Sequence, residues 1–159
     1  MNYYTLEETR KIIANWDAWG FWVSKELEEF RASMSEDDFI AFCQSQFNGT
    51  GADSMSDSQR KILSFMLKLR ETVGMHDLDY YLSDGTLRGW KWADTRFYEN
   101  GRIEIRARWK VYNPYRYLMF VKLRIAKYLL DKAGATAYKS AYERFASVDS
   151  GQWTVDNEE

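Results

Sequence analysis

The amino-acid sequence predicts an all-α protein, a small multi-helix bundle that contains an antiparallel pair of helices joined by a short turn. Three observations support this fold class. Pro114 is the only proline in 159 residues, so few helices are interrupted by a residue that lacks a backbone N–H. Apolar residues recur at helical spacing, and no stretch shows the alternation of a half-buried strand. Residue pairs with capping-box spacing precede several of these stretches.

The first expected helix runs from about Leu6 toward Arg31. Thr5 and Glu8 have the spacing in which two side chains satisfy each other's free backbone N–H groups at a helix start. Gly20 is the one position where we expect this helix to be interrupted.

A second helix is expected over about Glu36 to Gln46, because Ser35 and Asp38 repeat the capping spacing. Residues 48–54, which contain two glycines among short polar residues, then form the most loop-like stretch of the chain.

The third predicted helix begins near Ser56, where Gln59 completes another capping pair. The apolar residues that indicate it by helical spacing are Ile62, Phe65, Met66, Leu69, Val73 and Met75. Asp84–Gly85 is then typical of a turn.

The C-terminal half predicts three more helices. One runs from Leu87 past Trp109 and ends at Asn113–Pro114, because the residue before proline is pushed out of the helical region. Another covers Tyr115 to Lys132 and stops near Gly134, and the last covers about 135–145.

The length and composition fit one globular domain. The chain is 45% hydrophobic and 17% aromatic, which is enough to bury a core, and we expect its Trp, Tyr and Phe side chains to fill it. We expect residues 1–146 to form a single helical domain and residues 147–159 to form a mobile acidic tail. A formal charge of −2 offers no general attraction to nucleic acid, which is therefore not an expected partner.

Charge is unevenly distributed, since Arg102 to Lys132 is rich in Arg and Lys. Such a stretch is usually a solvated helix face, and the alternative is a surface that faces phosphate or lipid. No signal-like segment opens the chain and no apolar run reaches membrane-spanning length. We therefore expect a protein without a transmembrane segment, cytoplasmic or released by a signal-independent route.

Several kinds of chemistry are excluded by residue content. Cys43 is the only cysteine, so no internal disulfide forms; it lies in the apolar run 39–43, has no base beside it, and is expected in the core. One histidine and one cysteine are too few for the usual zinc site. No Lys-Ser or Lys-Thr pair follows the glycines of residues 48–51, which excludes a phosphate-binding loop.

The candidate catalytic residues surround the only histidine, His76. Asp77 follows it directly and Tyr80 lies one helical turn on. If the helices on either side of Asp84–Gly85 are antiparallel, Asp94 comes level with His76. A facing carboxylate fixes the tautomer of a histidine that acts as a general base, and the Tyr80 hydroxyl has the spacing to donate to Asp94. The more common explanation of a lone histidine beside a carboxylate is a structural pair.

These residues resemble a known family. The segment His76 to Tyr80 is similar to the HD-x-x-Y signature of phospholipase A2, and Ala93 to Phe97 resembles the second catalytic helix of its prokaryotic and phage-encoded members. Asn48 to Gly51 resembles the calcium loop of that superfamily, and Ser83 to Thr86 stands in place of its glycine-rich turn. The likeness extends loosely from Asn48 to about Tyr138. Residues 47–146 would then be the phospholipase A2-like part, and residues 1–46 a helical cap.

The resemblance implies calcium-dependent hydrolysis of the sn-2 ester of phospholipids at a membrane interface. His76 would be the general base, Asp94 would orient it and Tyr80 would brace Asp94. The implied calcium ligands are Asp77, Asn48, Gly49 and Gly51. Asp79 has no role in the family, and we expect it to be solvated. The expected contacts with lipid are Trp90, Trp92 and Tyr81.

The calcium loop meets a geometric difficulty. A straight helix from Asp57 to His76 would place its start roughly 28 Å from the histidine. Residues 52–56 span at most about 17 Å, so the loop would not reach the metal. We therefore predict that the helix breaks around Thr72-Val73-Gly74, a weak helical stretch; a helix that continues through Gly74 would weigh heavily against the loop.

Three functions remain open from the sequence. The first is an active phospholipase A2-like hydrolase. The second is a catalytically inactive relative, of the sort that phages or mobile elements encode, which binds a protein partner or serves as a structural protein. The third is an unrelated helical bundle in which His76 and Asp94 form a structural pair.

Overall fold

The computed structural model of the chain describes residues 4–47, 67–82 and 86–132. Within these ranges every regular element is helical and none is a strand, so the predicted all-α class is confirmed. The elements are α1 (Leu6–Trp19), α2 (Lys25–Ala32), α3 (Glu36–Gln46), a short 3-10 turn η1 (Leu67–Leu69), α5 (Arg70–Tyr81), α6 (Leu87–Arg108) and a helix over 114–132.

The start and end of α1 follow from local chemistry. The Thr5 hydroxyl accepts a hydrogen bond from the Glu8 backbone N–H at 3.2 Å, and the Glu8 carboxylate accepts from the Thr5 N–H at 2.8 Å. Gly20 ends the helix in the left-handed conformation, with φ 70°, which glycine adopts without a Cβ penalty. The predicted interruption at Gly20 is confirmed, and Ser24 caps the separate helix α2.

Two other helix starts also depend on a hydroxyl cap. Ser35 accepts from the Asp38 N–H at 3.2 Å at the start of α3, as predicted, and Thr86 accepts from the Gly89 N–H at 3.0 Å at the start of α6. Helix α6 ends at Arg108, where Trp109 becomes extended. The break therefore comes earlier than the predicted end at Pro114, which instead begins the next helix.

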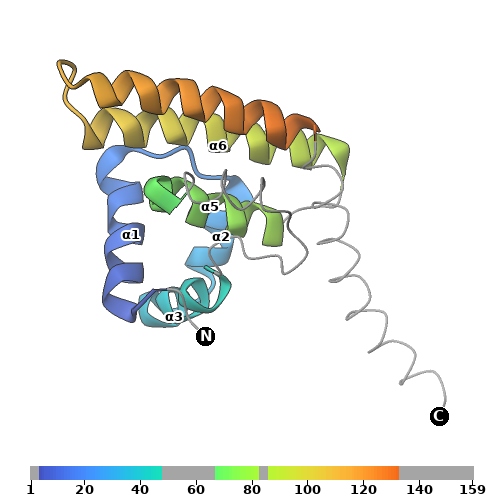
Figure 1. Ribbon diagram of the computed structural model, residues 1–159. Coiled ribbons are helices and arrows are strands. Elements are labelled where there is room, and N and C mark those ends of the chain that lie inside the picture. The colour runs from blue at the N-terminus through green and yellow to red at the C-terminus, as the bar shows by residue number, and fades with distance from the viewer. Residues whose placement is uncertain (1–3, 48–66, 83–85, 133–159) are drawn as a thin grey trace, which may run out of the picture.

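The helices pack as two groups around α5. Figure 1 shows α6 and the helix over 114–132 side by side along one face of the molecule, with α5 and then α1 to α3 beneath them. One buried cluster lies among α1, α2, α3 and α5 and includes Ile12, Trp16, Phe39, Phe47 and Leu78. A second lies between α5, α6 and the helix over 114–132 and includes Val73, Phe97, Ile105, Met119 and Leu123.

Gly101 sets how closely α6 approaches the helix over 114–132. A Cβ at this position would lie 2.6 Å from Leu123 Cδ1 and 2.9 Å from Leu123 Cδ2, closer than packed atoms tolerate. The absence of a side chain at Gly101 therefore lets Leu123 pack directly against the backbone of α6.

The predicted break at Thr72-Val73-Gly74 is wrong. Helix α5 continues through all three residues from Arg70 to Tyr81. Packing explains why a weak helical stretch stays helical here, because both Thr72 and Gly74 are buried. A Cβ on Gly74 would lie 3.1 Å from two ring carbons of Phe47, so the small residue accommodates an aromatic ring from the α3 side of the core.

A side chain from another helix caps α5. Its own N-cap residue, Leu69, has non-helical dihedral angles and no side chain that can accept a hydrogen bond. Glu104 of α6 takes that role: its Oε2 accepts from the Thr72 N–H at 2.9 Å and from the Thr72 hydroxyl at 2.7 Å. This tertiary cap satisfies an N–H group that a helix start leaves unpaired.

The observed bounds of α5 bear on the predicted calcium loop. The α-helix begins at Arg70, six residues or about 9 Å before His76, and the 3-10 turn η1 (Leu67–Leu69) precedes it. Continuity through Gly74 removes the break that was predicted to bring the loop to the histidine, which weighs against the loop. The predicted features over 48–66, the turn at 83–85 and everything after residue 132, including the acidic tail, lie outside the described residues.

Candidate functional site

The only histidine contacts the carboxylate that the sequence analysis assigned to it. His76 Nε2 lies 3.0 Å from Asp94 Oδ1, and the Tyr80 hydroxyl donates to the same oxygen at 2.8 Å. His76 and Tyr80 are one turn apart on α5, so both face the point of α6 where Asp94 lies. The predicted contacts among these three side chains are confirmed.

The cluster is enclosed by protein. The Asp94 side chain is completely buried and that of His76 is 7% exposed. The imidazole contacts two aromatic rings, with its centroid 4.1 Å from that of Tyr80 and 5.1 Å from that of Phe97. These contacts hold the plane of the His76 ring relative to Asp94.

The hydrogen bond to Asp94 determines the histidine tautomer. An ionised carboxylate is only an acceptor, so His76 Nε2 carries the proton that it shares with Asp94. In the neutral ring, Nδ1 then holds the lone pair. Among the described residues, no side chain or backbone group makes a hydrogen bond to Nδ1. A histidine in this state can accept a proton at Nδ1 while the carboxylate stabilises the resulting imidazolium.

Asp77 lies beside this site with one oxygen unused. The residue is half-buried, yet its Oδ2 atom is fully covered and has no hydrogen-bond partner among the described residues. Burial raises the pKa of Asp77 to about 7, while His76 acts in the opposite direction. A covered carboxylate oxygen with no donor is an atom that a cation would satisfy.

Calcium would find only part of a binding site in the described residues. Within 4–47, 67–82 and 86–132, no group of three His, Cys, Asp or Glu side chains is arranged to hold a metal. Asp77 fits the role of a single ligand, whereas calcium takes six to eight oxygens. The other predicted ligands, Asn48, Gly49 and Gly51, lie outside the described residues.

Asp79 is not solvated, contrary to the prediction. Its side chain is 1% exposed and accepts a hydrogen bond from Arg96 Nε of α6 at 2.8 Å. Burial raises the pKa of Asp79, and the Arg96 charge opposes that shift. The helical position explains the error: residues 76 and 79 are three apart on α5, so both face α6.

The three aromatic residues expected to contact lipid occupy different environments. Trp90 is buried, and Tyr81 is half-buried with its ring 5.1 Å from Phe42. Trp92 is 45% exposed and forms an edge contact with Trp22, which is 40% exposed. These two indoles line a cavity of about 410 Å³ whose polar wall includes Asp79, Arg88 and Arg96.

A second buried carboxylate cluster was not predicted from the sequence. Glu71 of α5 and Glu104 of α6 are both completely buried, and Arg108 pairs with both of them, its Nε lying 2.7 Å from Glu104 Oε1. Asn15 of α1 donates to Glu71 Oε1 at 2.9 Å, and the Trp16 indole donates to the Glu71 carbonyl at 2.8 Å. The network therefore joins three helices.

The two glutamates differ in protonation. Burial raises the pKa of Glu104 to about 8, and the neighbouring Glu71 adds to the rise. For Glu71, burial is outweighed by hydrogen bonds from Glu104 and Asn15 and by Arg108, which hold its pKa below the ordinary value. At neutral pH the pair therefore shares one proton, held on Glu104. The available sequence signal was the spacing of residues 94, 97, 101, 104 and 108, which share one face of α6.

No protein-family model, curated protein or solved structure matches this chain in sequence or fold. Among the described residues, no helix has the length and hydrophobicity needed to cross a bilayer.

Proposed function

We propose that this protein is a phospholipase A2-like hydrolase that cleaves the sn-2 ester of a phospholipid with His76 as the general base. The observation that carries the proposal is the His76–Asp94–Tyr80 cluster, in which Nε2 is hydrogen-bonded to Asp94 and Nδ1 has no hydrogen bond to any described residue. A structural pair needs only the hydrogen bond between Nε2 and Asp94. A general base also needs Nδ1 to be unused, so that it can accept a proton.

Each residue has a distinct task in this proposal. His76 Nδ1 takes a proton from the attacking water, and Asp94 keeps the ring in the required tautomer and stabilises the imidazolium. Tyr80 donates to Asp94 Oδ1 at 2.8 Å, which holds that carboxylate level with the histidine. Phe97 makes an edge contact with the His76 ring, with 5.1 Å between the ring centroids, and limits its rotation.

Calcium is the cofactor we propose, with Asp77 as the ligand among the described residues. When bound, calcium supplies a Lewis acid that stabilises the negative charge on the ester oxygen. The Oδ2 atom of Asp77 supports this assignment, because it is covered and has no hydrogen-bond partner in the part of the chain that the structure describes. Asn48, Gly49 and Gly51 remain the proposed partners of Asp77 in the metal site.

The site also needs contact with a lipid surface. Trp22 and Trp92 support this part of the proposal, because they are partly exposed aromatic side chains that pack together at one cavity. Exposed aromatic rings of this kind insert at the interface of a bilayer.

Calorimetric calcium titration is the first test, performed on the wild type and on Asp77→Asn. Asp37→Asn is a matched control, since it makes the same chemical change on a side chain that is 83% exposed. The proposal expects saturable binding in the wild type and in Asp37→Asn and none in Asp77→Asn. Absence of binding at millimolar calcium would overturn the hydrolase in this form.

The second test measures fatty acid release from phospholipid vesicles with calcium and with a chelator. We expect sn-2 release that needs calcium and is lost in His76→Gln, while circular dichroism shows the variant to be folded. Release that persists in His76→Gln would assign the activity to another group.

One observation favours the alternative of an inactive relative that binds a partner. Only 7% of the His76 side chain is exposed, which leaves little access for an ester. Calcium binding at Asp77 without any hydrolysis would select this alternative.

A further inference from the structure

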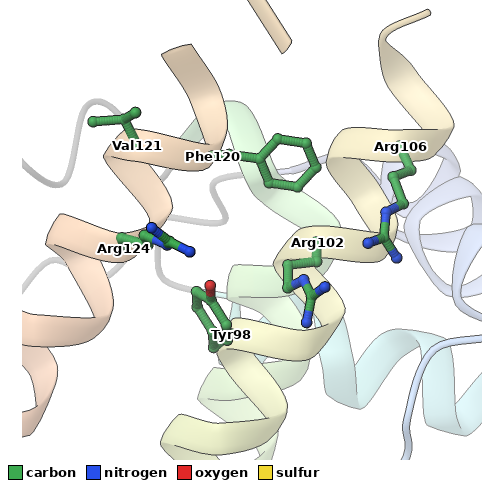
Figure 2. A pocket seen from close by; sticks show the side chains of 6 residues that line it. All are labelled: Tyr98, Arg102, Arg106, Phe120, Val121 and Arg124. Carbon is green, nitrogen blue, oxygen red and sulfur yellow. The ribbon is translucent and has the colours of Figure 1, made fainter. Parts of the chain in front are cut away.

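A cleft between α6 and the helix over 114–132 gathers three arginines. The cleft has a volume of about 360 Å³ and is lined by Tyr98, Arg102, Arg106, Phe120, Val121 and Arg124. Figure 2 shows Tyr98, Arg102 and Arg106 extending from α6 and the other three from the opposite helix. None of the described residues that line this cleft is acidic.

The positive charge of the cleft is only partly neutralised. Arg102 pairs with Glu99 at 3.2 Å, but both side chains are more than a third exposed, so this pair is weak. Neither Arg106 nor Arg124 has a carboxylate within 4.0 Å among the described residues. The guanidinium group of Arg116, which does not line the cleft, lies 5.9 Å from the centre of the Phe120 ring.

The sequence around the cleft adds to its positive charge. Residues 102–132 contain nine Arg and Lys against two acids, a net charge of +7, in a chain whose formal charge is −2. One of those two acids, Glu104, is buried against Arg108 and does not face the cleft. Cations concentrated on a concave surface raise the local concentration of anions.

The side chains that line the cleft indicate which kind of anion it would bind. Guanidinium groups bind phosphate through parallel N–H donors, so three of them suit a dianion better than a carboxylate. The rings of Tyr98 and Phe120, together with Val121, offer apolar contact to the rest of the ligand. The volume is that of a pocket for a small molecule.

We infer that this cleft binds a phosphate monoester whose phosphate lies between Arg102, Arg106 and Arg124 and whose organic part packs against Tyr98 and Phe120. The site goes beyond the proposed hydrolase: it uses neither His76 nor calcium. A free metabolite and a lipid headgroup share this chemistry. The exposed Tyr117, Ile125 and Tyr128 beside Val121 would contact the bilayer in the second case.

The test is calorimetric titration with phenyl phosphate, inorganic phosphate and phenol, each in the presence of a metal chelator. We expect phenyl phosphate to bind more tightly than inorganic phosphate and phenol not to bind. The double variant Arg106→Gln/Arg124→Gln should weaken phenyl phosphate by about a hundredfold, roughly tenfold for each charged hydrogen-bonding group. His76→Gln should bind like the wild type.

The matched control is Lys110→Gln/Lys132→Gln, which removes the same charge from the same segment but outside the cleft. Equal weakening in this control, or no binding of phenyl phosphate to the wild type, would overturn the inference. Vesicles of phosphatidylcholine with and without phosphatidic acid separate the two sources. Vesicle binding that needs phosphatidic acid and is lost in the arginine variant indicates a lipid headgroup, and binding of phenyl phosphate alone indicates a soluble ligand.

Discussion

Glu104 gives the folded protein a proton that the unfolded chain does not hold, and Glu104→Gln removes it. The ordinary pKa of this carboxyl is 4.5, and burial together with Glu71 raises it to about 8 in the folded state. Between these values folding takes up one proton. The contribution of Glu104 to stability is therefore complete below about pH 4.5 and is lost as the pH rises to about 8.

The magnitude follows from the linkage. One proton taken up on folding changes the free energy of unfolding by about 1.4 kcal/mol per pH unit. Between about pH 5.5 and about pH 7.5 the wild type should thus lose up to about 3 kcal/mol through Glu104. Glu71, whose pKa is held below its ordinary value, is ionised in both states over this window and contributes nothing. Asp77 and Asp79 also titrate, but both residues are present in the wild type and in Glu104→Gln. Their contributions therefore cancel in the difference between the two free energies of unfolding.

The assay is urea unfolding followed by tryptophan fluorescence at several pH values. We expect the free energy of unfolding of the wild type, minus that of Glu104→Gln, to fall by up to about 3 kcal/mol between about pH 5.5 and about pH 7.5. Glu99→Gln is the control, because it makes the same change on the same helix at a side chain that is 42% exposed. A difference for Glu104→Gln that does not vary with pH would show that Glu104 is ionised in the folded protein and refute the argument.

Three further predictions concern stability and are measured by the same unfolding assay. Gly101→Ala should lower the free energy of unfolding by about 1–3 kcal/mol because the new Cβ meets Leu123. The double variant Gly101→Ala/Leu123→Ala should be more stable than the sum of the two single effects predicts. An unchanged stability of Gly101→Ala would show that the helices can separate freely. Arg96→Gln should lower the free energy of unfolding by about 3 kcal/mol because it leaves the buried Asp79 carboxylate without its cation. Adding Asp79→Asn should restore part of this loss. If the effects of the two substitutions simply add, this coupling is contradicted. Thr5→Ala should cost about 0.5–2 kcal/mol through the lost cap, and no loss would mean that the start of α1 is held by tertiary contacts.

Much of the fold was predictable because it depends on neighbours in the sequence. Thr5 and Ser35 cap helices through residues three positions on, and Gly20 ends α1 because it adopts a positive φ without strain. The contacts of His76 were predictable for a similar reason. Helical spacing places Tyr80 one turn away, and equal distances from the turn place Asp94 on the facing helix.

Other features required the tertiary structure. Thr72-Val73-Gly74 has weak helix propensity, yet it stays helical because Glu104 from another helix caps it and Phe47 packs on Gly74. Asp79 was expected in solvent because it has no role in the family that the chain resembles, and its burial against Arg96 follows from the packing of α6 on α5.

The sequence by itself determined the all-α class, several helix ends and the residues of the histidine cluster, since each depends on spacing within one helix or across one turn. Only the tertiary structure decided which carboxylates are buried, which helix caps which, and that arginines from two helices meet in one cleft. Burial and charge pairing depend on how helices distant in the sequence pack, and this is set by the shape and volume of the whole core rather than by any local pattern.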